Sequence, residues 1–380
     1  MNKSPLSLAL GGLLAMAAGI GVGRFVYTPI LPPMVEALGL SKSAAGLIAS
    51  ANFVGYLAGA LLAAWPGLPG TRRGWLLGAL AANAFCLAAM GATEQIASFL
   101  VLRLIAGIAS AFALVFSSAL VLDRLARTGH SALSAVHFAG VGAGIALSAA
   151  LVAWLLAHHE AWSSLWYASG ALSALAFAAV WRLVPPEDGA AAPAGAAAAG
   201  RHGGFALLIA AYGLFGFGYV ITATFLMALV RGAPALAPLE PYVWIFVGLA
   251  AAPSTVLWNA LAKRWGILRA FAVAAIVEAV GVAASVLWIS TASIVIAAVL
   301  LGGTFMGLTA LGLIAARQRG SGDPRARIAL MTAMFSAGQI VGPAFAGYAY
   351  DATGSLTLPS LAAATALVIA ASLALLADRR

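Results

Sequence analysis

The chain has 380 residues, of which 63% are hydrophobic and only 8% are charged, with a formal net charge of +9. Soluble domains carry about a quarter charged residues, so this composition and the mean hydropathy of +1.02 exclude a soluble globular protein. Apolar runs long enough to cross a bilayer recur along the whole length, and they predict an all-α polytopic membrane protein.

Twelve apolar segments, bounded by charged residues, Pro or Gly, are predicted as membrane-spanning helices. The first six cover residues 6–34, 44–65, 74–92, 96–122, 132–157 and 162–184. The second six cover residues 205–230, 242–261, 268–289, 293–316, 326–350 and 358–376. The first segment is too long for the apolar part of a signal peptide and lacks a convincing cleavage site, so it is expected to remain as a helix.

The two sets of helices are separated by PPEDGAAAPAGAAAAGRHGG, whose Pro, Gly and Ala content is typical of a flexible linker. The predicted organisation is an N-terminal six-helix bundle at residues 1–184, a linker at 185–204 and a C-terminal six-helix bundle at 205–380. Of the basic residues outside the helix interiors, only Lys42 and Arg231 fall on one side of this map. The positive-inside rule therefore predicts both termini and the linker in the cytoplasm, with the protein in a bacterial-type inner membrane.

Two arginines, Arg24 and Arg103, lie inside predicted helices, where each costs roughly 2.5 to 3.5 kcal/mol on insertion scales. Counting about 1.5 Å per residue places both in the outer half of the bilayer. Together their guanidinium groups can bind a carboxylate, phosphate or sulfonate, which predicts a site for an organic anion.

A structural role for these arginines is the alternative. One of them would then pair with Glu36, or would donate to backbone carbonyls freed by Pro29, Pro32 and Pro33.

Other polar residues within the helices are candidates to contact a substrate, although each could instead form a hydrogen bond between helices. They are Tyr27, Thr28, Asn52, Tyr56, Tyr219, Thr222, Thr304 and Gln339. His137 and Glu278 are candidates for proton coupling, because an imidazole or a buried carboxylate can exchange a proton in the membrane. Helix packing for His137 and a structural hydrogen bond for Glu278 remain alternatives.

One group of residues has a composition that could bind a metal, namely His158, His159 and Glu160. Adjacent histidines do not share a helical face, so a solvated loop is expected there and no metal site. The single cysteine, Cys86, lies in the middle of a helix and excludes an internal disulfide. The basic residues are scattered through short loops, so the net charge does not indicate nucleic-acid binding.

The two halves show a weak internal repeat, which is typical of transporters built from duplicated helix bundles. Gly21-Val-Gly23-Arg24 corresponds to Gly216-Phe-Gly218-Tyr219, and Arg103-x-x-x-Gly107 to Ala298-x-x-x-Gly302. Gly140-x-x-x-Gly144 likewise corresponds to Gly338-x-x-x-Gly342, and such spacing allows helices to approach closely.

These features resemble the major facilitator superfamily of secondary transporters: six plus six helices, a central linker, and the Arg-x-x-x-Gly signature in RLIAGIASA. GVGRFVYTPILPPM, HFAGVGAGIALS, GFGYVITATFL and GGTFMGLTALG are more narrowly similar to its YbfB/YjiJ-type group. The resemblance implies that helices 1, 4, 7 and 10 line a central cavity that opens to either side in turn, and that helix 9, which carries Glu278, is peripheral. In the loop between helices 2 and 3, GALLAAWPGLPGTRR lacks the acidic residue of the superfamily's usual pattern, and LAKRWG has Lys263 at the equivalent position.

The sequence thus favours a secondary transporter that moves a small organic solute, with the arginines favouring an anion. The chain has no Gly-x-x-x-x-Gly-Lys-Ser/Thr loop for ATP hydrolysis, so coupling to protons is expected. The expected partners are the substrate, the bilayer and the proton, with no cofactor, metal, catalytic residue or obligate protein partner. A polytopic membrane enzyme and a non-transporting sensor are the alternatives, although eleven acidic residues, mostly isolated, offer an enzyme little catalytic machinery.

Overall fold

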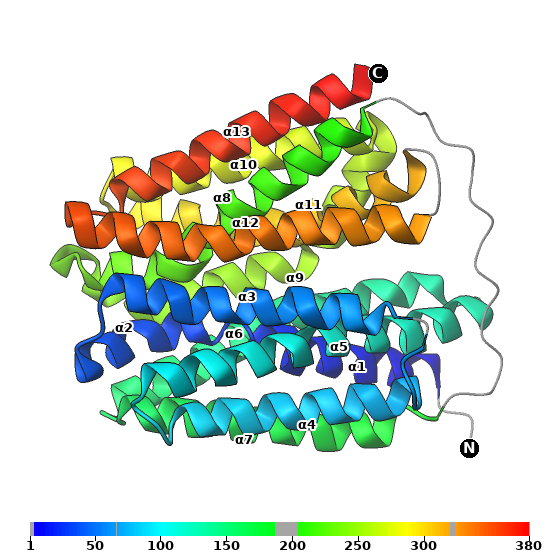
Figure 1. The fold of residues 1–380 in the computed structure, drawn as a ribbon, viewed down its shortest axis with the longest axis horizontal. Coiled ribbons are helices and arrows are strands. Elements are labelled where there is room, and N and C mark those ends of the chain that lie inside the picture. Colours follow the sequence, from blue (N-terminus) through cyan, green and yellow to red (C-terminus); the bar gives the residue numbers. More distant parts are fainter. Residues whose placement is uncertain (1–3, 66, 187–203, 320–323, 380) are drawn as a thin grey trace. The chain divides into compact units, whose positions relative to one another are not determined.

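A computed structural model of the protein describes residues 4–65, 67–186, 204–319 and 324–379. The described residues contain twelve helices that are long and apolar enough to cross a membrane, at the twelve predicted positions. The expectation of an all-α membrane protein with twelve membrane-spanning helices is confirmed, and Figure 1 traces the helices in chain order.

The chain divides into two compact units, of which the first comprises residues 1–39 and 51–193 and the second residues 40–50 and 194–380. The first seven α-helices are α1 (Pro5–Met16), α2 (Tyr27–Leu38), α3 (Lys42–Ala63), α4 (Arg72–Met90), α5 (Ile96–Arg127), α6 (Ser134–Ala157) and α7 (Trp162–Leu183). The remaining six are α8 (Phe205–Arg231), α9 (Glu240–Trp265), α10 (Ile267–Leu287), α11 (Thr291–Gln318), α12 (Pro324–Thr353) and α13 (Thr357–Arg379). Most of the expected linker, residues 187–203, lies outside the described residues.

Local sequence signals set several helix ends. The side chain of Ser4 accepts a hydrogen bond from the backbone N–H of Ser7 at the start of α1, and Thr71 accepts one from Gly74 at the start of α4. Ser290 and Ser293 form a reciprocal capping box at the start of α11. Gly39 ends α2 in the left-handed conformation, with φ of 63°, which glycine adopts without steric cost.

The first membrane span differs from the single helix predicted over residues 6–34. A π-helical segment, Ala17–Val22, follows α1, and four residues of turn precede α2. Within the break, the N–H of Gly23 donates to the carbonyl of Ala18, five residues earlier, at 2.9 Å. The three glycines at 19, 21 and 23 are weak helix formers, so regular helix is easily interrupted there.

The repeated glycine pairs pack against the first helix of their own half. A Cβ at Gly144 of α6 would lie 2.5 Å from the carbonyl oxygen of Ala17, which is well inside van der Waals contact. In α12, a Cβ at Gly342 would lie 2.6 Å from a methyl carbon of Val220 in α8. The predicted close approach is therefore confirmed, and equivalent helices are paired in both halves.

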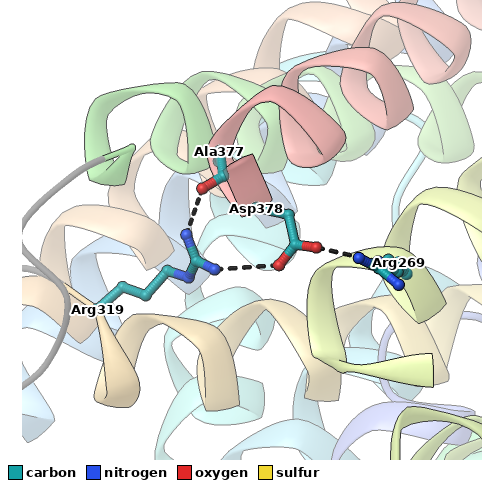
Figure 2. Close-up of polar contacts among 4 residues, drawn as sticks. All are labelled: Arg269, Arg319, Ala377 and Asp378. Carbon is teal, nitrogen blue, oxygen red and sulfur yellow. Dashed lines mark hydrogen bonds and ion pairs between the residues drawn. The ribbon is translucent and has the colours of Figure 1, made fainter. Parts of the chain in front are cut away.

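Basic residues tie helix ends together within each unit. Arg73, at the start of α4, donates to the carbonyl oxygens of Trp181 and Val184, at 2.7 and 2.8 Å. In the second unit, Asp378 near the end of α13 accepts from Arg319 and from Arg269, each at 3.1 Å (Figure 2). These contacts hold the start of α10 to the ends of α11 and α13. In the topology predicted from the sequence, these helix ends lie on the side of the membrane that carries most of the basic residues.

The beginning of α3 is held by α12. The carboxylate of Asp351 accepts from the backbone N–H groups of Lys42 and Ser43, at 3.1 and 2.9 Å, so an acidic side chain occupies the positive end of the helix dipole. Two turns further on, Ser50 donates to the carbonyl of Ile340 at 2.7 Å. These contacts explain why residues 40–50 group with the second unit.

Candidate substrate-binding site

Arg24 lies in the turn between the π-helical segment and α2 and is only 6% exposed. Its guanidinium carbon is 4.4 Å from the ring centroid of Phe53, 4.7 Å from that of Tyr56 and 5.4 Å from that of Phe25. It also donates a hydrogen bond to the Tyr56 hydroxyl. Cation–π contacts in a desolvated setting are worth about 2 kcal/mol each, so the three rings lower the cost of burying this charge.

Arg103, in α5, reaches the break of the first span and is 2% exposed. Its two terminal nitrogens donate to the carbonyl oxygens of Gly23 and Arg24, both at 3.3 Å, and its guanidinium carbon is 4.9 Å from the ring centroid of Tyr27. Arg103 therefore supplies donors to carbonyls that regular helix would have satisfied, which is the kind of contact that the structural alternative describes. These carbonyls are not the ones that the prolines free, however, because a proline removes the donor for the carbonyl four residues earlier, which for Pro29 is that of Phe25.

Two residues that the sequence analysis did not single out complete this backbone support. Asn83 of α4 donates to the carbonyl of Ala18 at 3.0 Å, and Ser110 of α5 donates to that of Gly19 at 2.6 Å. Both side chains are almost fully buried. A lone asparagine within an otherwise apolar span is the one signal that pointed to Asn83, whereas Ser110 resembles any small helix-packing residue.

The Arg-x-x-x-Gly signature joins α5 to α3. The amide nitrogen of Asn52 donates to the carbonyl of Arg103 at 2.9 Å, and one turn later Gly107 leaves room for the carbonyl oxygen of Asn52. The contact made by Asn52 is thus the interhelical hydrogen bond that was its alternative role. Tyr27 and Thr28, at the start of α2, are 2% and 3% exposed.

The candidates in the second unit form a separate group around Tyr219 of α8. Its ring stacks on Phe305 and on Phe335, with centroids 5.8 Å apart in each case and interplanar angles of 6° and 2°. The amide of Gln339 in α12 donates to the Tyr219 hydroxyl. Thr222, one turn along α8, is 4% exposed.

Thr304 stands apart from that group, beside Glu278. The Thr304 hydroxyl donates to the carbonyl of Leu300 at 2.6 Å and is the polar neighbour of the fully buried Glu278 carboxyl group. His137, in the first unit, lies against Ser118, with Nε2 at 3.2 Å from the hydroxyl, and against the Cα of Gly12, whose missing side chain makes room for the imidazole. His137 is thus placed where three helices, α1, α5 and α6, pack together.

The described residues contain no group of three or more His, Cys, Asp or Glu side chains that could hold a metal ion. In the loop after α6, Nδ1 of His158 donates to the carbonyl of Trp154 at 2.8 Å, and His158, His159 and Glu160 are all exposed.

Comparisons with known proteins agree with this architecture. A curated gallate transporter of Pseudomonas putida is 31% identical over 180 residues, which are 47% of this chain and 39% of that protein, so the match spans about two fifths of the relative's length. The crystal structure of the nucleoside transporter NupG superimposes with a TM-score of 0.72 at 17% identity and covers 99% of both chains. A bacterial homologue of the human lysosomal transporter Spinster gives 0.71 at 17% identity, covering 99% of this chain and 96% of that one.

The human organic anion transporter MFSD10 gives a TM-score of 0.67 at 14% identity, covering 98% and 100% of the two chains. At such identities the structural likenesses bear on the fold alone. The family described as uncharacterised MFS-type transporter YbfB matches residues 16–375. The chain is therefore a multi-pass membrane protein that belongs to the YbfB-type family of major facilitator superfamily transporters.

Proposed function

We propose that this protein is a secondary active transporter that moves a small aromatic carboxylate across the cytoplasmic membrane by alternating access, coupled to protons. The observation that carries the proposal is Arg24, a buried cation on a broken helix, surrounded by three aromatic rings. A guanidinium group binds a carboxylate through two parallel hydrogen bonds, while neighbouring aromatic faces accept a planar ring. Such a setting suits a ligand that combines both groups.

The two arginines have different tasks in this proposal. Arg103 holds the carbonyls of Gly23 and Arg24 and is a positioning residue, which fixes the turn that carries Arg24. Arg24 contacts the substrate. Broken membrane helices commonly form the binding sites of secondary transporters, because their backbone is not committed to regular helix.

The named activity of a relative supports the same substrate class. The Pseudomonas putida protein that matches part of this chain is called a gallate transporter, and gallate is a benzoate with three ring hydroxyls. The distribution of basic residues supports cytoplasmic termini.

Substitution of Arg24 tests the proposal. We expect the purified protein in liposomes to exchange labelled benzoates by counterflow, and Arg24→Gln to raise KM by roughly tenfold or more, because a hydrogen bond to a charged group is lost. Arg72→Gln is the matched control, since Arg72 is 42% exposed and pairs with Asp123 at 3.5 Å. Failure of the wild type to exchange any aromatic carboxylate would refute the substrate class, and release of a chemically altered product would indicate an enzyme.

Glu278 is the preferred carrier of the coupling proton. Its carboxyl group is fully buried in α10, and neither oxygen meets the geometry of a hydrogen bond to another described residue, although Thr304 is adjacent. The imidazole of His137, by contrast, is fitted into a helix crossing through Ser118 and Gly12, which favours packing.

Replacing Glu278 by glutamine separates coupling from substrate binding. We expect Glu278→Gln to abolish accumulation driven by an imposed pH gradient while retaining counterflow, which needs no net proton movement. Glu160→Gln, in an exposed loop, is the control. Gradient-driven accumulation at the wild-type rate in Glu278→Gln would remove Glu278 from the coupling mechanism.

A further inference from the structure

Three buried polar side chains on α8 and α12 lack hydrogen-bond partners among the described residues. The hydroxyls of Thr222 and Ser336 and the amide oxygen of Gln339 are all unsatisfied, and these residues are 4%, 0% and 0% exposed. In a membrane span an unsatisfied polar group is costly, because lipid offers no substitute for water. Three such groups on two helices that contact each other indicate a partner outside the described residues.

Neighbouring hydroxyls on the same helices behave differently. Thr224 of α8 donates to the carbonyl of Val220 at 2.7 Å, and Thr332 of α12 donates to that of Ile328 at 2.8 Å. Back-bonding to the preceding turn is the ordinary way in which a membrane helix satisfies a hydroxyl. Thr222 and Ser336 have the same option and do not use it, which leaves both hydroxyls directed elsewhere.

The unsatisfied groups surround the hydrogen bond between Tyr219 and Gln339. Thr222 lies three residues after Tyr219, and Ser336 three residues before Gln339, so each pair shares a helical face. The glycine contacts of Gly216 with Phe335 and of Gly342 with Val220 show that α8 and α12 run parallel. Thr222 and Ser336 therefore flank the central pair on opposite sides, over about 9 Å of helix length.

We infer that Tyr219, Thr222, Ser336 and Gln339 form a hydroxyl-recognition patch that binds ring hydroxyls of the transported molecule. This inference rests on the proposed function and specifies which aromatic carboxylates are preferred. The patch contains no charged residue, and the stacked rings of Phe305 and Phe335 adjoin it. A neutral, planar, polar group is the chemistry that fits.

The amide of Gln339 makes a hydroxyl the best match. The amide group of Gln339 can be placed in two orientations that differ by exchange of its oxygen and nitrogen. The amide atom that does not contact Tyr219 is an acceptor in one orientation and a donor in the other. A hydroxyl both donates and accepts, as do the side chains of Thr222 and Ser336. It satisfies the patch in either arrangement, whereas a carboxylate or an ammonium satisfies only one.

Thr222 and Thr224 offer a matched pair of substitutions on one helix. Counterflow would be measured with 3,4,5-trihydroxybenzoate and with unsubstituted benzoate for the wild type, Thr222→Val, Ser336→Ala and Thr224→Val. We expect Thr222→Val and Ser336→Ala each to raise KM for the trihydroxybenzoate by about tenfold while leaving KM for benzoate within twofold. Thr224→Val should not discriminate between the two compounds.

The alternative results are distinct. Equal effects of Thr222→Val on both compounds, or no effect on either, would overturn the patch while leaving the transport of aromatic carboxylates intact. If the wild type carries neither compound, the proposed function fails, and the patch is then tested by thermal shift with the neutral 1,3,5-trihydroxybenzene. Stabilisation of the wild type and of Thr224→Val, but not of Thr222→Val, would support the patch, and any other pattern would refute it.

Discussion

Arg103→Met is expected to lower the free energy of unfolding by about 3 kcal/mol and to abolish transport. The substitution leaves the carbonyls of Gly23 and Arg24 without their side-chain donors, and each buried acceptor left unsatisfied costs roughly 1 to 3 kcal/mol. Loss of the turn geometry also misplaces Arg24. The effect would be measured as a lower thermal unfolding midpoint in detergent, together with the loss of counterflow.

Two further variants separate the hydrogen bonds donated by Arg103 from the role of Arg24. Arg103→Lys keeps the charge but replaces the planar fork with a single ammonium, so an intermediate loss of stability is expected. Arg24→Gln should alter KM with a smaller loss of stability than Arg103→Met. A wild-type unfolding midpoint in Arg103→Met would show that the hydrogen bonds to the turn contribute little to the fold.

Gly107→Val is expected to prevent α3 and α5 from packing and to reduce the yield of folded protein severely. A Cβ at position 107 would fall well inside van der Waals contact with the carbonyl oxygen of Asn52. That oxygen belongs to the backbone and cannot move aside as a side chain can, so overpacking costs at least the usual 1 to 3 kcal/mol. Size-exclusion chromatography of the membrane extract would measure the folded fraction.

Gly78→Val on α4 is the matched control for this substitution. Gly78 is exposed, and a Cβ there would meet nothing within 4 Å, while the change in helix propensity is the same. We expect it to be tolerated. Equal yields from Gly107→Val and Gly78→Val would mean that the α3–α5 contact can relax at little cost.

Much of the fold was predictable because lipid restricts the backbone to helices. The apolar runs, and the charged residues, Pro and Gly that separate them, therefore locate each span. The break of the first span was not predictable. Gly19, Gly21 and Gly23 indicated that the helix could bend, but the π-helical segment is held by Asn83 of α4 and Ser110 of α5, and the turn after it by Arg103 of α5. Such tertiary donors carry no signature in the local sequence.

The candidate site was predictable only in its charges. Arg24 and Arg103 stand out because a charged residue is costly within a membrane helix, and the structure buries both side chains. The different contacts of the two guanidinium groups could not be foreseen, since both were equally able to bind an anion or a carbonyl. Phe53 lies near Arg24 but resembles any apolar residue of a membrane helix in sequence. Thr222 and Thr224 likewise become distinguishable only through their hydrogen bonds.

The bonds of Arg103 also bear on how the chain enters the membrane. During synthesis the first span emerges before α5, so the carbonyls of Gly23 and Arg24 are already in the bilayer when Arg103 has to follow. An arginine that costs a few kcal/mol in an isolated helix gains these acceptors once α5 packs against the turn. The charge of α5 is therefore matched by the backbone of a helix that precedes it in the chain, so the stability of α5 within the bilayer depends on its packing against the first span.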